Sequence, residues 1–94
     1  MPATAVRMPV TVEIEDVTEP AQFADLATAV TALWNSLRAL PLGNYQYEAY
    51  REFFGGGAER VDEFLQRDGE LTLCFAMAGR SHAVKVRPVA RTLR

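Results

Sequence analysis

Cysteine and histidine each occur once in the chain, as Cys74 and His82, so a Cys–His nucleophile pair would have to use these two residues. Both fall within residues 71–88, where large apolar residues alternate with small or polar ones. Successive side chains of a strand point to opposite faces. We therefore expect Cys74 and His82 on opposite faces of a hairpin, too far apart to share a proton. Lys85, the expected cross-strand neighbour of Cys74, would favour its thiolate.

The glycines at 55–57 precede a predicted helix and only loosely resemble a phosphate-binding loop. Such a loop needs Lys followed by Ser or Thr, whereas Ala58 and Glu59 follow here, and an acidic side chain repels phosphate. One His and one Cys are too few for a zinc site without carboxylates, and the acidic pairs lack the spacing of a calcium loop. We predict no catalytic, cofactor-binding or metal site, and no enzymatic activity.

The formal net charge is −2, but it is unevenly distributed along the chain. Residues 1–70 carry 5 basic and 12 acidic side chains, whereas residues 71–94 carry 5 basic and no acidic ones. The second group forms a possible basic patch for nucleic acid, made of Arg80, Lys85, Arg87, Arg91 and Arg94. Aromatic residues interleaved with these basic residues, as on a base-stacking platform, are missing there, and Glu13 and Glu15 can neutralise the patch within the fold.

Two segments have the alternation typical of strands with one buried face. The first is residues 8–16, and the second is the hairpin at 71–88. A two-residue turn at Gly79–Arg80 would pair Phe75 with Val84. The outer hairpin face would then carry small or polar residues, namely Thr72, Cys74, Ala76, Ala78, Ser81, Ala83, Lys85 and Arg87.

Three helices are predicted between these strands. Thr18 and Pro20 suit the start of a long helix that ends at Leu40, before Pro41, with apolar residues at spacings of three and four. A second helix covers residues 45–54, and the following glycines separate it from a third helix at 58–67.

The expected fold class is α+β, with element order β-α-α-α-β-β in two layers. The helices would pack on one side of a three-stranded antiparallel sheet of order 1-3-2. The first and last strands are placed side by side because Glu13 and Glu15 would then face Lys85 and Arg87. We expect a single domain at 8–90, a flexible tail at 1–7 and a basic tail at 91–94.

The segment from Tyr45 to Phe54 holds five of the nine aromatic residues. Its helix can bury one face, so Tyr47, Tyr50 and Phe54 are expected to serve the core while Tyr45 and Phe53 remain partly exposed. Tyrosine is enriched at interfaces. The candidate interface residues, from this segment and the outer hairpin face, are Tyr45, Tyr47, Tyr50, Phe53, Thr72, Cys74, Ala76, Lys85 and Arg87.

These observations favour a non-enzymatic module that binds a protein partner and self-associates as a homodimer. One alternative is a nucleic-acid-associated accessory protein that uses the basic hairpin and tail. A second alternative is a small ligand-binding domain or enzyme with a pocket between helices and sheet. A single cysteine allows no internal disulfide, and no apolar run approaches a membrane span. A cytoplasmic location without membrane contact is therefore expected.

Overall fold

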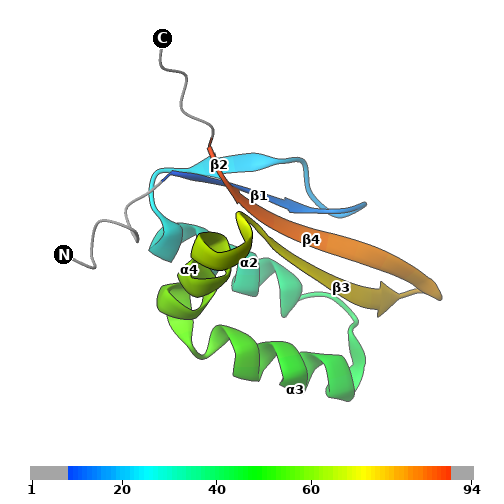
Figure 1. Ribbon diagram of the computed structural model, residues 1–94. Helices are drawn as coiled ribbons and strands as arrows, with labels where there is room; N and C mark the ends of the chain where they lie inside the picture. Colours follow the sequence, from blue (N-terminus) through cyan, green and yellow to red (C-terminus); the bar gives the residue numbers. More distant parts are fainter. Residues whose placement is uncertain (1–8, 90–94) are drawn as a thin grey trace, which may run out of the picture.

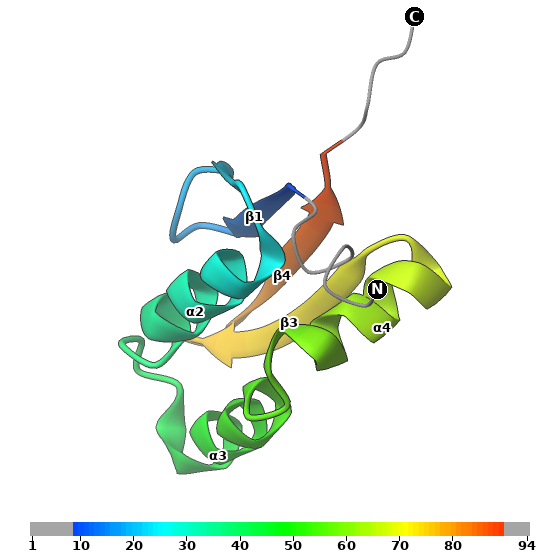
Figure 2. The same ribbon diagram turned by 90° about the vertical axis from the view of Figure 1, so that its left-hand side faces the viewer.

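A computed structural model describes residues 9–89 of the chain, so the predicted tails at 1–7 and 91–94 lie outside the described residues. The helices lie on one side of the sheet, and its other side is left open by the described elements (Figure 1; Figure 2). In chain order the elements are β1 (Val10–Ile14), β2 (Ala21–Phe23), α2 (Leu26–Leu37), α3 (Gly43–Phe54), α4 (Gly57–Asp68), β3 (Leu71–Met77) and β4 (Arg80–Pro88).

The sheet has four strands in the order β2-β1-β4-β3, and all neighbouring pairs are antiparallel. The α+β class is confirmed, but the prediction of three strands is wrong, because β2 extends the sheet beyond β1. The predicted order of the other three strands is confirmed, with β4 between β1 and β3. Glu13 lies across from Lys85, as expected, while Arg87 lies across from Thr11.

The first predicted helix starts too early in the sequence. Residues 21–23 pair with β1 as a strand, and α2 begins only at Leu26. Asp25 caps this helix, because its carboxylate accepts a hydrogen bond from the Thr28 N–H at 2.7 Å. The Thr18 hydroxyl instead accepts a hydrogen bond from the Ile14 N–H in the turn between β1 and β2. The helix ends at Leu37, three residues before its predicted end at Leu40.

The hairpin exists where it was expected, but its register differs by two residues. The turn residues are Ala78 and Gly79, both with positive φ, so Phe75 pairs with His82 and not with Val84. A type I′ turn needs positive φ at both positions. A shift of two residues preserves the faces of both strands. The predicted inner face is therefore retained, and His82 and Val84 are buried on it.

The other two helices lie close to their predicted ranges; Gly55 and Gly56 separate them, and Gly57 is the first residue of α4. Gly69 ends α4 in the left-handed conformation, with φ of 84°, as expected of glycine just past a helix. Side chains from both layers meet in one core, which includes Val10, Ile14, Leu26, Leu33, Leu37, Val61, Val84 and Val86. Within residues 9–89, none of the helices has the length and apolarity needed to cross a membrane.

Candidate functional site

The outer face of the β3–β4 hairpin carries small, uncharged side chains. Cys74 lies beside Ala83, and Ala76 beside Ser81, on adjacent strands. Cys74, Ala76 and Ser81 are exposed, and Ala83 is half-buried. The helices α2, α3 and α4 lie away from this face (Figure 1). We call these four residues, together with Thr72 in the neighbouring row, the small-residue patch.

Charged side chains border the small-residue patch on the side of β1. Glu13 lies across from Lys85, and Lys85 also lies across from Thr72. Arg87 lies two residues beyond Lys85 on β4, and its side chain therefore points to the same face. Both signs of charge therefore stand next to each other along one border of an otherwise neutral surface.

Cys74 and His82 point to opposite faces of the hairpin, as the alternation predicts. Cys74 is exposed on the outer face, whereas His82 is 4% exposed on the inner one. The expected pairing of Cys74 with Lys85 is wrong, because the observed register places Ala83 across from Cys74. The cation expected to favour its thiolate is thus not its direct cross-strand neighbour.

The free edge of β3 is closed by side chains of α3. The Gln46 amide donates to the Ala76 C=O at 2.8 Å and accepts from the Ala76 N–H at 2.7 Å. The Tyr50 hydroxyl donates to the Cys74 C=O. Burial raises the pKa of Tyr50, and the electrostatic interaction with Cys74 raises it further. These contacts occupy main-chain groups that a further strand would need.

Most aromatic residues of α3 pack inside the molecule. The Tyr47 ring lies 5.5 Å from that of Trp34, and the Phe53 ring lies 5.6 Å from that of Phe64. Tyr50 is buried, with a hydroxyl that bonds within the chain. Tyr45, by contrast, is 91% exposed. The aromatic segment therefore mainly joins the helices to one another, and Tyr45 is its member on the surface.

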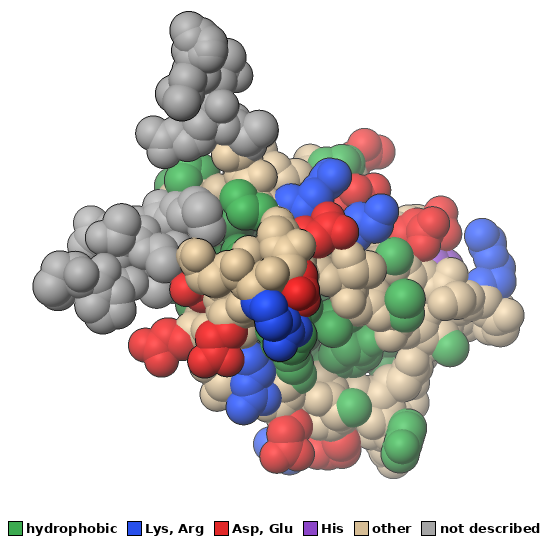
Figure 3. Space-filling view, viewed as in Figure 1, with side chains coloured by type: hydrophobic (Ala, Val, Ile, Leu, Met, Phe, Trp, Pro, Cys, Tyr) green, Lys and Arg blue, Asp and Glu red, His purple; other side chains and the backbone are tan. Residues whose placement is uncertain are grey.

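His82 lies in a polar cluster at the end of the hairpin, where acidic and basic side chains gather around a histidine (Figure 3). Its Nδ1 is 3.1 Å from the Asp16 carboxylate, and its Nε2 is 3.3 Å from the Met77 C=O. Arg80 is 3.6 Å from the same carboxylate. The cluster ties the turn after β1 to the hairpin although Asp16 and His82 are 66 positions apart.

The same cluster could offer ligands to a cation, because Glu15, Asp16 and His82 each have a ligand atom within 4.8 Å of the others. The Glu15 carboxylate already accepts a hydrogen bond from the Ala83 N–H at 2.9 Å, and Asp16 already faces Arg80. These bonds give the cluster a structural role. Spacing along the chain did not reveal it, and the expectation of no metal site stays a prediction.

The predicted basic patch is only partly within the described residues, since Arg91 and Arg94 lie outside them. Of the described members, Arg80 pairs with Asp16 at the hairpin end, and Lys85 lies across from Glu13. Neighbouring carboxylates thus offset part of the charge that would attract a phosphate backbone.

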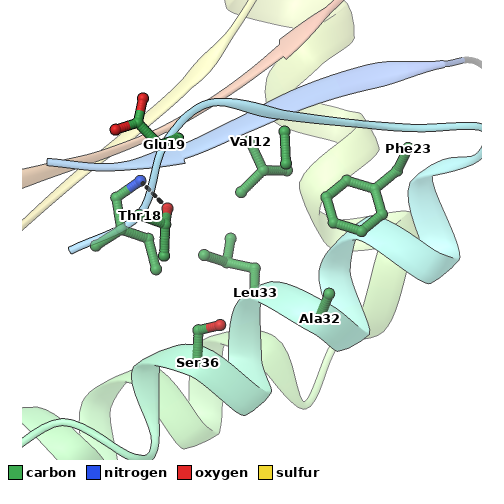
Figure 4. Close-up of a pocket in the computed structure, with 9 residues that line it drawn as sticks. Val12, Thr18, Glu19, Phe23, Ala32, Leu33 and Ser36 are labelled. Carbon is green, nitrogen blue, oxygen red and sulfur yellow. Dashed lines mark hydrogen bonds between the residues drawn. The ribbon is translucent and has the colours of Figure 1, made fainter.

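An apolar pocket of about 130 Å³ lies between β2 and α2 (Figure 4). Val12, Phe23 and Leu33 are apolar lining residues, and Ala32 and Ser36 contribute small side chains from α2. The Thr18 hydroxyl at one end is engaged with the Ile14 N–H. The second alternative anticipated a pocket between helices and sheet, although the sequence did not locate it, because β2 was expected to be helical.

Comparison of the chain with models of known protein families, with curated proteins and with solved structures gives no match. What the protein does must therefore follow from its own surfaces. The small-residue patch and the pocket beside β2 are both open in the described part of the chain.

Proposed function

We propose that this protein is a non-catalytic interaction module that self-associates through the small-residue patch. The observation that carries the proposal is the composition of this uncovered sheet face. Cys74 and Ala76 on β3 lie beside Ala83 and Ser81 on β4, with no large or charged side chain among them.

Solvent-exposed strand positions usually carry β-branched, aromatic or charged side chains, and alanine is depleted from strands. Two alanines and a cysteine side by side give little cross-strand packing, so they contribute little to the sheet itself. Sheets with side chains of ordinary size stack face to face at about 10 Å. Smaller side chains allow a second sheet to approach more closely than this. The composition therefore suits close face-to-face contact.

A second copy of the chain is the partner that the charge pattern favours. In a twofold interface the same patch meets itself, and a neutral patch does so without repulsion between like charges. Glu13 and Lys85 at its border let each copy present opposite charges to the other. Strand addition at β3 is less suited to self-association, because Gln46 and Tyr50 already bond the edge groups of Ala76 and Cys74.

The single cysteine gives a direct test, because Cys74 is exposed on the patch. We expect the rate of its reaction with Ellman's reagent to fall as protein concentration rises through the dissociation constant of the dimer. Light scattering coupled to size exclusion should show a monomer changing to a dimer over the same micromolar range. Replacement of Ala76 by Glu should abolish both effects, because each copy would then bury an unpaired carboxylate.

Ala49→Glu is the matched control, because Ala49 is an exposed alanine on α3 and the substitution brings the same charge. It should leave the dimer and the thiol protection unchanged. Circular dichroism checks that both variants fold. A wild-type monomer throughout the micromolar range, with a thiol that reacts equally fast at every concentration, would contradict the proposal.

A further inference from the structure

The two edges of the sheet differ in a way that points to a second binding surface. The β3 edge is closed by Gln46 and Tyr50. At the other edge, β2 presents the main chain of Gln22, for which no hydrogen bond outside the β1–β2 pairing is found within residues 9–89. One edge of the sheet is therefore available for pairing in the described part of the chain.

The hydrogen-bonding pattern of β1 shows which way Gln22 faces. Glu15 N–H donates to the Ala83 C=O at 2.9 Å, and Val89 N–H donates to the Pro9 C=O at 3.0 Å. Odd-numbered residues of β1 thus turn toward β4, and Val10 and Val12 turn toward their partners in β2. Gln22 lies between those partners, so its N–H and C=O point away from the sheet.

The apolar pocket lies directly inside this edge. Ala21 and Phe23 of β2 line it from the sheet, and Ala32, Leu33 and Ser36 line it from α2. Its volume of about 130 Å³ is close to that of an engineered cavity of roughly 150 Å³ that holds benzene. The pocket therefore matches one aliphatic or aromatic side chain, and it is too small for an extended cofactor.

The surroundings of the pocket are acidic. Residues 13–25 contain five carboxylates and no Lys or Arg, and Glu19 lines the pocket at one end, with its exposed carboxylate directed outward (Figure 4). Asp16 already faces His82 and Arg80, and Asp25 caps α2. Glu19 is therefore the carboxylate available to a ligand at the pocket. An occupant with a positive charge beside its apolar group complements this rim.

We infer that the edge of β2 and the pocket together form a binding site for an extended peptide of a partner protein. The peptide adds a strand by pairing with Gln22, inserts one apolar side chain between β2 and α2, and carries Lys or Arg beside that anchor. In this mode main-chain hydrogen bonds supply affinity, and the pocket supplies specificity. The site is separate from the small-residue patch, so it extends the proposed function to a second partner.

The probe is a phage-displayed library of random linear ten-residue peptides, selected on the wild-type protein. We expect enriched peptides that carry an apolar residue next to Lys or Arg. Ala32→Phe fills the pocket and should lower their affinity by about tenfold or more, the cost of expelling one apolar side chain. Ala27→Phe, at an exposed position of the same helix, is the control and should bind like the wild type.

Two substitutions of Gln22 separate strand addition from simple occupation of the pocket. Gln22→Pro removes the outward N–H without breaking a bond to β1, and proline is tolerated at such edge positions. It should weaken binding about tenfold, as expected for one lost main-chain hydrogen bond. Gln22→Ala should bind normally. Equal binding by both variants would show that the peptide does not extend the sheet and would overturn the inference.

Other outcomes also decide the question. No enrichment, or peptides that bind Ala32→Phe as well as the wild type, would overturn the inference. Enriched peptides that lack a basic residue, or that bind the Glu19→Gln variant with wild-type affinity, would overturn the role of the acidic rim in binding. If Ala32→Phe fails to fold, Ala21→Phe fills the pocket from the exposed strand side. Ala76→Glu should still bind the peptides, so failure of self-association is distinguishable from failure of this site.

Discussion

Tyr50 connects α3 to the edge of the sheet through one hydroxyl group. Its side chain is buried, and its hydroxyl donates to the Cys74 C=O. His82 works similarly at the hairpin end, where its two ring nitrogens face the Asp16 carboxylate and the Met77 C=O. Each residue satisfies polar groups of distant segments in the chain, and each leaves an unpaired group if it is removed.

Tyr50→Phe is expected to lower the free energy of unfolding by about 1 kcal/mol, the usual value of one such hydrogen bond. The raised pKa of Tyr50 also predicts a pH effect. The folded state retains the phenolic proton more strongly than the unfolded state, so this contribution is complete below pH 10.0 and is lost as the pH rises through the folded value. Urea unfolding at neutral and alkaline pH measures both effects.

The Tyr50→Phe variant should lose less stability than the wild type over the alkaline range, because it has no phenol to ionise at this position. Tyr45→Phe is the matched control, since Tyr45 is 91% exposed. Its unfolding curve should follow that of the wild type at every pH. An identical alkaline loss in Tyr50→Phe and the wild type would contradict the prediction.

At the scale of elements, the hairpin turn is unusual in its backbone conformation, and the β3 edge is unusual in its hydrogen bonding. Ala78 adopts φ of 55°, a conformation that costs a residue with a Cβ about 1–2 kcal/mol. The two-residue turn requires this conformation, and Gly79 at φ of 77° adopts it without such a cost. At the β3 edge, the single side-chain amide of Gln46 makes the two main-chain hydrogen bonds that a neighbouring strand would make.

Ala78→Asn is expected to stabilise the protein by about 0.5–1 kcal/mol, because Asn tolerates the left-handed conformation and Asn followed by Gly favours a type I′ turn. Ala78→Val should instead destabilise it, since a branched Cβ is strongly disfavoured at positive φ. Thermal or urea unfolding of the two variants measures the difference. If the valine variant were the more stable one, the assigned turn would be wrong.

Gln46→Ala is expected to cost about 1–2 kcal/mol, because the Ala76 N–H and C=O lose their partner. The opened edge should also promote association between β3 strands, seen as a rise in light scattering and thioflavin fluorescence at high concentration. Gln66→Ala, which removes an exposed glutamine from α4, serves as the control. Equal stability and equal association of the two variants would count against closure of the edge by Gln46.

At the scale of the whole molecule, the sheet has helices on one face only (Figure 2). A chain of 94 residues buries a smaller share of its surface than larger domains do, and its stability is correspondingly limited. Contact between the outer faces of two sheets would add burial that one copy does not supply.

Self-association through the small-residue patch predicts that the melting temperature depends on protein concentration. Above the dissociation constant, each tenfold increase in concentration adds about 0.7 kcal/mol per protomer and raises the melting temperature by about 3–5 °C, because mass action favours the associated folded state. Ala76→Glu should melt at the same temperature at all concentrations. Scanning calorimetry over a concentration range of about a hundredfold tests this, and a constant melting temperature for the wild type would contradict it.

The sequence by itself determined features that repeat within one element. The alternation of apolar and polar residues in 8–16 and 71–88 predicted which strand faces are buried. Apolar residues at spacings of three and four predicted the amphipathic helix that ends at Leu37 in the structure. These patterns follow from local geometry, because a period of two or 3.6 residues fixes which side chains share a face. The placement of β4 beside β1 also followed, from the opposite charges of Glu13 and Lys85.

Only the tertiary structure decided the features that depend on contacts between distant segments. β2 has three residues, too few for a period to show, and its pairing with β1 overrode the helix start at Thr18. The hairpin register was undecided because a shift of two residues preserves both faces, so the turn conformation of Ala78 and Gly79 selected it.

The two candidate binding surfaces show the same division. The small residues of the outer hairpin face were visible in the sequence, because alternation places them together. The pocket and the closed β3 edge were not, since they arise where β2 meets α2 and where Gln46 meets Ala76, 30 positions away. Local patterns state which way a side chain faces, whereas the packing of whole elements determines what it meets there.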